Sequence, residues 1–123
     1  MFDISIQLTV ENFGNTALNN LIVFDDIVTQ FAGLSPTNFS ASSNGTLAVN
    51  PNWDGSATSN ILQAGQSMAA SAAAESVMIS FQVTPGANTT TVNNLATASG
   101  TPPGGTPVTD TSTNGLNPDP DGN

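Results

Sequence analysis

The side chains in this sequence that could do chemistry are carboxylates, amides and hydroxyls. Nine residues are acidic, and Lys, Arg, His, Cys and Tyr are all absent, so the formal net charge of the 123 residues is −9. Pairs of nucleophile and base that rely on His, Cys or Lys are therefore excluded. Disulfides and thiolate metal sites are excluded for the same reason. The oxygen atoms that remain are hard ligands, and calcium is the metal that they suit.

Two stretches share a spacing that resembles the start of a calcium loop. They read Asn50-x-Asn52-x-Asp54-Gly55 and Asn117-x-Asp119-x-Asp121-Gly122. Neither stretch is an EF-hand, because Ile61 stands where the first would need its final acid and the second runs off the chain. A polar turn is the alternative for both stretches, and we favour it for the first. In the second, the two Asp residues also suit a bound cation.

A third candidate for calcium combines carboxylates from different parts of the sequence. Asp25 and Asp26 follow an expected strand, and a neighbouring loop could add Asp110. Adjacent carboxylates repel each other unless they are solvated or bridged, and a divalent cation would remove that cost. A solvated strand end is the alternative. Zinc and copper are not expected at any of these places, since they normally bind His or Cys.

Trp53 is the one residue that could stack against a sugar ring, although a lone Trp in a β-protein more often packs in the core or in a loop. A glycosidase would need two acids across a cleft, usually beside aromatic platforms. The sequence has one Trp, no Tyr and no cation to tune a pKa. We therefore expect a protein that is not an enzyme, with Trp53 as a candidate ligand-binding residue only.

Strands must position these residues, because apolar and polar side chains alternate along much of the chain. The alternation is clearest over residues 2–11 and 77–83. Further strands are expected at residues 18–24, 45–49, 92–99 and 108–112, the last two forming a hairpin. Gly, Asn and Pro separate the strands.

Two segments give weaker patterns. Residues 27–43 predict a loop or a short irregular strand, and the Ala-rich residues 63–75 predict a helical turn. Six or seven short strands with turns between them predict an all-β fold, an immunoglobulin-like antiparallel β-sandwich of about seven strands. Residues 1–116 would form this unit, and residues 117–123 an acidic linker of Pro, Asp and Gly.

The charge excludes several partners. Nucleic-acid binding and attraction to an anionic membrane both depend on Lys and Arg, which are absent. No apolar stretch approaches the roughly 20 residues that span a bilayer, so direct membrane insertion is not expected. An acidic chain rich in Thr and Asn and free of Lys is unlike a cytosolic protein. We therefore expect an extracellular location at a cell surface.

Several segments together resemble a conserved tandem-repeat domain of large bacterial and archaeal surface proteins. Leu8–Leu21 resembles that domain's signature V-x-N-x-G-N-x-x-L-x-x-V. The resemblance continues through residues 23–26, 49–55, 94–98 and 110–121. In that family such units are strung along fibrous adhesins and surface filaments as β-sandwich spacers. Family members usually carry one more strand before the position of Phe2, and this sequence lacks it.

The resemblance implies a structural repeat of an extracellular fibre or adhesin stalk, with residues 117–123 as the linker to the next repeat. The β-core would stiffen such a repeat, and so would calcium if the candidate ligands bind it. A sandwich without its first strand leaves a sheet edge open, and an open edge accepts a strand from another chain. Neighbouring copies of the repeat are thus the expected partners, unless the unit was simply cut from a longer array. A glycan-binding module that recognises a host-surface ligand through Trp53 is the alternative function.

Overall fold

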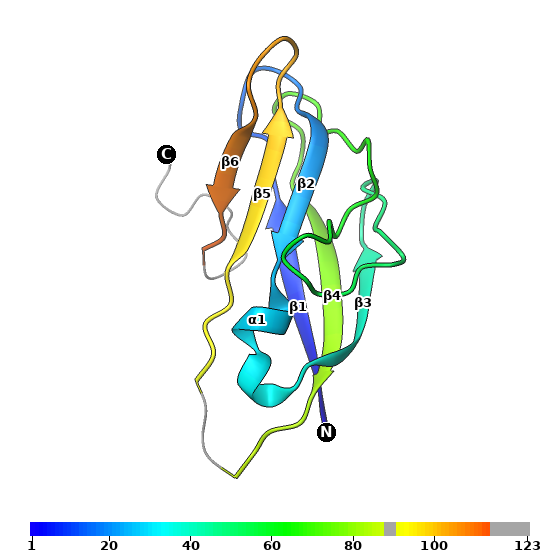
Figure 1. The fold of residues 1–123 in the computed structure, drawn as a ribbon. Coiled ribbons are helices and arrows are strands. Elements are labelled where there is room, and N and C mark those ends of the chain that lie inside the picture. Colours follow the sequence, from blue (N-terminus) through cyan, green and yellow to red (C-terminus); the bar gives the residue numbers. More distant parts are fainter. Residues whose placement is uncertain (88–90, 114–123) are drawn as a thin grey trace.

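Two antiparallel sheets of three strands each form the protein, as the computed structural model of residues 1–87 and 91–113 shows (Figure 1). One sheet has the strand order β1-β4-β3 and the other β2-β5-β6. The all-β prediction is confirmed, with six strands in the described residues. Their bounds are β1 Phe2–Val10, β2 Asn19–Asp25, β3 Thr37–Ser43, β4 Glu75–Val83, β5 Ala96–Thr101 and β6 Val108–Thr111.

Strands β1 and β4 form the longest ladder and follow the alternation in the sequence. They pair without interruption from Phe2 opposite Val83 to Val10 opposite Glu75. On β4 every second side chain is buried, because this central strand is covered by the other sheet. The corresponding side chains of β1 are only half-buried or exposed. Alternation in the sequence therefore predicts both strands, but only β4 lies fully in the core.

The turn between β1 and β2 is organised by Asn12, one of the residues that carry the family resemblance. Its side chain is buried, and its Nδ2 atom donates to the carbonyl oxygens of Thr16 at 2.9 Å and Ala69 at 3.0 Å. Its Oδ1 atom accepts from the N–H of Gly14 at 3.0 Å. Asn12 thereby satisfies buried backbone groups of both the turn and the segment beside it.

Residues 27–43, expected to be a loop or a short irregular strand, fold into three short elements. They are α1 Ile27–Gln30, the 3-10 helix η1 Ala32–Leu34 and strand β3. Asp26 begins α1, since its Oδ1 atom accepts from the N–H of Thr29 at 3.2 Å. Ile27 and Phe31 then turn inward and are buried. Tertiary burial of these two side chains holds a helix too short to be stable alone.

Residues 44–74 form a long irregular segment in place of the expected strand and helical turn. The strand predicted at residues 45–49 is reduced to a single bridge between Val49 and Leu62. No helix forms over residues 63–75. Gly65 and Ser71 both have positive φ, which a helix does not allow. Most of the Ala-rich stretch is exposed, so it gains no burial that could stabilise a short helix.

This long segment closes one flank of the two-sheet core. Its buried apolar side chains join those of both sheets in one cluster, and they are Leu47, Trp53, Ile61, Leu62 and Met68. It also pairs with the free edge of β2, because the N–H of Ile61 donates to the carbonyl of Val23 at 2.8 Å. The same edge receives the side chain of Asn60, whose Oδ1 accepts from the N–H of Val23. The edge of β2 is thus covered by the chain itself.

Candidate functional site

Asp25 is the last residue of β2 and is fully buried, with an exposed fraction of 0%. Its Oδ1 accepts from Nε2 of Gln30 at 3.0 Å, and its Oδ2 accepts from Nδ2 of Asn94 at 2.6 Å. Desolvation raises the pKa of Asp25 from 3.8 to about 6, against these two hydrogen bonds, which lower it. Repulsion from Asp26 adds a smaller upward contribution. Burial therefore keeps the pKa of this carboxylate well above its usual range.

Asp25 and Asp26 do not face a common site, although they are adjacent in the sequence. Asp25 continues the inward side of β2, whereas Asp26 caps α1 with its side chain. Gln30 fills the space near Asp25: its Nε2 also donates to the carbonyls of Asp26 at 3.2 Å and Leu95 at 3.1 Å. The amide group of Gln30 thus bridges oxygens of Asp25, Asp26 and Leu95.

Asp110 lies two strands away from Asp25 in the same sheet. Asp25 pairs with Ala96 on β5, whereas Asp110 of β6 pairs with Ala98. Two strand spacings are about 10 Å, and the two-residue offset along the strands adds about 7 Å in the perpendicular direction. Asp110 is therefore too distant from Asp25 to share a metal ion with it. Over residues 1–87 and 91–113, no three acidic side chains come together.

The stretch from Asn50 to Gly55 uses its oxygen atoms in local turns. Oδ1 of Asn50 accepts from the N–H of Asn52 at 2.9 Å, and Oδ1 of Asp54 accepts from the N–H of Ser56 at 3.0 Å. The hydrogen bonds from Ser56 also hold the pKa of Asp54 below its usual 3.8. Nδ2 of Asn50 donates to the carbonyl of Asn60 at 3.0 Å. These contacts are those of a polar turn.

The second stretch with this spacing lies outside the residues that the structure describes. It contains the predicted ligands Asn117, Asp119 and Asp121, together with the linker at residues 117–123. Calcium binding there stays a prediction.

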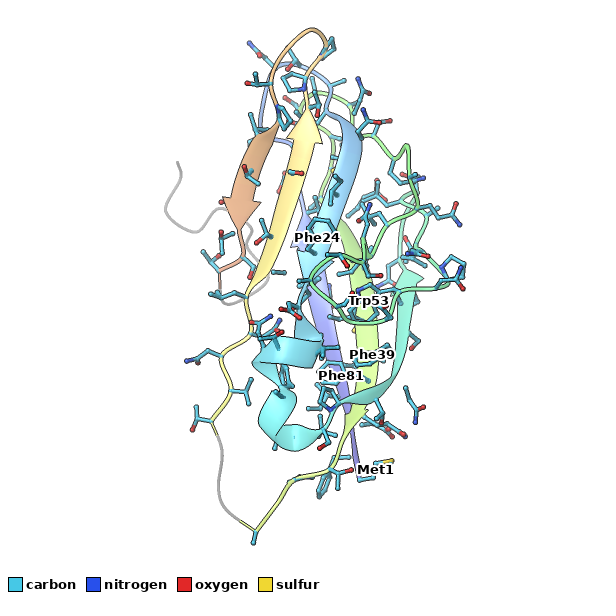
Figure 2. The ribbon with its side chains drawn as sticks, viewed as in Figure 1. Met1, Phe24, Phe39, Trp53 and Phe81 are labelled. Atoms are coloured by element: carbon cyan, nitrogen blue, oxygen red, sulfur yellow. The ribbon has the colours of Figure 1, made fainter. Side chains whose placement is uncertain are left out.

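Trp53 is buried in the core with an exposed fraction of 3%. Its ring meets that of Phe39 edge to face, with centroids 5.7 Å apart, and Phe39 in turn lies 6.2 Å from Phe81 (Figure 2). Nε1 of Trp53 is buried and has no hydrogen-bond partner among the described residues. A ring in this position has no open face for a sugar, so the geometry favours the packing interpretation of Trp53.

An open groove lies along the flank opposite the long 44–74 segment. It encloses about 460 Å³ between the edge strand β1 of one sheet and strands β5 and β6 of the other. Buried side chains such as Leu21, Val23 and Met68 form its floor. Leu8 and Val10 of β1 line it and are half-buried. This groove is a feature of the described surface that could receive a partner.

Strand β6 contributes one apolar and one acidic side chain to the groove. Val108 pairs with Gly100 and Asp110 with Ala98, and directly opposed residues of antiparallel strands point to the same face. Because Ala98 packs against the core, Val108 and Asp110 also point toward the core side. Both are nevertheless exposed, Val108 by 52%, because the groove leaves them uncovered.

The sequence prediction places Asp25 and Asp110 in one site, whereas the structure buries Asp25 at the end of β2 and places Asp110 in the groove. The signal for Asp25 was the period of two, which places it on the same side of β2 as Leu21 and Val23. The hairpin prediction likewise contained the signal for Asp110, two residues after Val108. No sequence pattern indicated which flank the long 44–74 segment would cover.

Comparisons with models of known families, with curated proteins and with solved structures find no match to this chain. The resemblance to the surface-protein repeat therefore stays a prediction. No helix among the described residues has the length and apolar character needed to cross a membrane.

Proposed function

We propose that this chain is a structural repeat of an extracellular surface fibre or adhesin stalk, with no catalytic role. Its fold in this proposal is an immunoglobulin-like sandwich whose first strand is not among these 123 residues. The observation that carries the proposal is the groove beside β1. An additional strand preceding Phe2, as in the family that the sequence resembles, would pair with the free edge of β1 and cover that groove.

The candidate sites give further support. The described carboxylates are dispersed, and those of Asp25, Asp26 and Asp54 are engaged by neighbouring amide or backbone N–H groups. Reactive groups other than carboxylates and hydroxyls are absent from the sequence. Such a chain offers a folded spacer and a docking edge, and little with which to bind or transform a small substrate. Its charge of −9 would keep neighbouring fibres soluble and apart.

Immunogold labelling of the cells that produce the protein tests this function. Antibodies raised against the folded chain should label intact cells, with gold particles following filaments or stalks at the surface. Cells lacking the gene are the control. Labelling that requires permeabilised cells would contradict the extracellular location, and diffuse surface labelling without filaments would contradict the fibre.

A further inference from the structure

The groove has the shape and the backbone chemistry to receive an extended strand. In an antiparallel ladder, alternate residues direct their N–H and C=O groups away from the partner strand. On β1 these groups face away from β4, toward the groove side, because β1 is the edge strand of its sheet. A strand placed there would cover Leu8 and Val10 and would face the inner side of β6 across the sandwich.

The groove is also acidic. Asp110 points into it from β6, and Glu11 lines it at the end of β1. The hydrogen bond to Asp110 comes from the N–H of Thr111, its own neighbour, at 2.9 Å. A new strand would bring its inward side chains toward Asp110, and covering a carboxylate without a partner is unfavourable. An inward Lys or Arg would remove this cost.

We propose that the groove binds a β-strand whose inward side chains are apolar at alternate positions, with a Lys or Arg facing Asp110. The proposal rests on the strand acceptance proposed above and specifies the partner. A second copy of these 123 residues cannot supply that cation, because the sequence contains no Lys, Arg or His. The strand therefore comes from a polypeptide segment other than these 123 residues.

Titration with a designed peptide tests the proposal. The probe is Val-Thr-Val-Thr-Lys-Thr-Val-Thr-Val, capped at both ends and as long as β1, which has nine residues. Its sequence reads the same in both directions, so it can pair parallel or antiparallel. The matched control peptide carries Gln in place of Lys. Binding is followed by amide chemical shifts, with the largest changes expected at Leu8, Val10 and Val108.

We expect the Lys peptide to bind about three- to tenfold more tightly than the Gln peptide at low salt, with the difference shrinking as salt rises. In Asp110→Asn the two peptides should bind equally. Asp3→Asn makes the same change in net charge but lies on the exposed outer face of β1, so it should keep the difference.

The other possible results of the titration distinguish failure of this proposal from failure of the proposed function. Equal binding of both peptides to the unaltered chain would overturn the requirement for a cation and leave strand acceptance intact. A difference that persists in Asp110→Asn would overturn the role of Asp110. Failure of both peptides to bind at the groove would overturn strand docking, whereas the location on a surface fibre is decided separately by the immunogold labelling.

Discussion

Because Asp25 is buried, the free energy of unfolding depends on pH through the titration of this one residue. Its pKa is about 6 in the folded chain and near 3.8 when unfolded. Between these values the folded state binds more protons than the unfolded state. The free energy of unfolding must therefore fall as pH rises from about 4 to about 6, and level off above that. Hydrogen bonds lower the pKa of Asp54 and Glu75. The stability that these two carboxylates contribute is therefore lost only below about pH 4.5.

We expect a decrease of roughly 2 kcal/mol between pH 4 and pH 7, which is the size that a pKa shift from 3.8 to about 6 gives over this range. Asp25→Asn should remove this slope and stabilise the chain at pH 7. The amide of Asn94 can turn over to accept from the new Asn, since its own Oδ1 is buried without a partner among the described residues. Urea unfolding at several pH values measures both effects.

Asp3→Asn is the control for this experiment, because Asp3 is exposed on the outer face of β1. It should keep the slope between pH 4 and pH 7. A slope that survives in Asp25→Asn would mean that another group titrates in this range and that the account of Asp25 is wrong.

At the scale of elements, the irregular 44–74 segment depends on a close contact between Gly55 and β3. Gly55 has a φ of +75°, and a Cβ atom there would lie 2.5 Å from the ring of Phe39. Gly65 has a similar φ of +82°, but open space surrounds the position of its Cβ. The two glycines therefore separate the cost of the backbone conformation from the cost of the steric clash.

We expect Gly65→Ala to reduce the free energy of unfolding by about 1 kcal/mol and Gly55→Ala by about 2–4 kcal/mol. Chemical denaturation of both variants gives the two values. Equal losses would mean that Phe39 moves aside freely and that the contact between this segment and β3 is loose.

The sequence predicts the regular elements better than the irregular ones, for a physical reason. Alternation in β1 and β4 reflects which face of each strand meets the core, and that is a local property. Residues 44–74 are instead shaped by distant contacts, such as those of Asn60 with β2. Nor does any local pattern indicate that the side-chain oxygens of Asn50 and Asp54 accept hydrogen bonds from nearby backbone N–H groups.

At the scale of the whole molecule, calcium binding is predicted in the linker that would join one unit to the next. In the described residues the candidate ligands are dispersed, and Asn117, Asp119 and Asp121 lie outside them. If the tail binds calcium, added calcium must raise Tm and EDTA must lower it, because a ligand that binds only the folded state stabilises it.

We expect this rise in Tm to be lost in the double variant Asp119→Asn/Asp121→Asn and to be kept in Asp54→Asn, whose carboxylate already accepts a hydrogen bond from Ser56. Differential scanning calorimetry provides the measurement. A Tm that responds to neither calcium nor EDTA in the unaltered chain would end the calcium hypothesis.

The two flanks of the sandwich are unequal: the chain's own 44–74 segment seals the side of β2, and the side of β1 stays open. If the open side of one subunit holds a strand that belongs to the next subunit but lies outside these 123 residues, the contact uses two different surfaces, and repeating it yields a polar polymer with distinguishable ends. Growth by this route would have a direction, set by which end still presents a vacant acceptor.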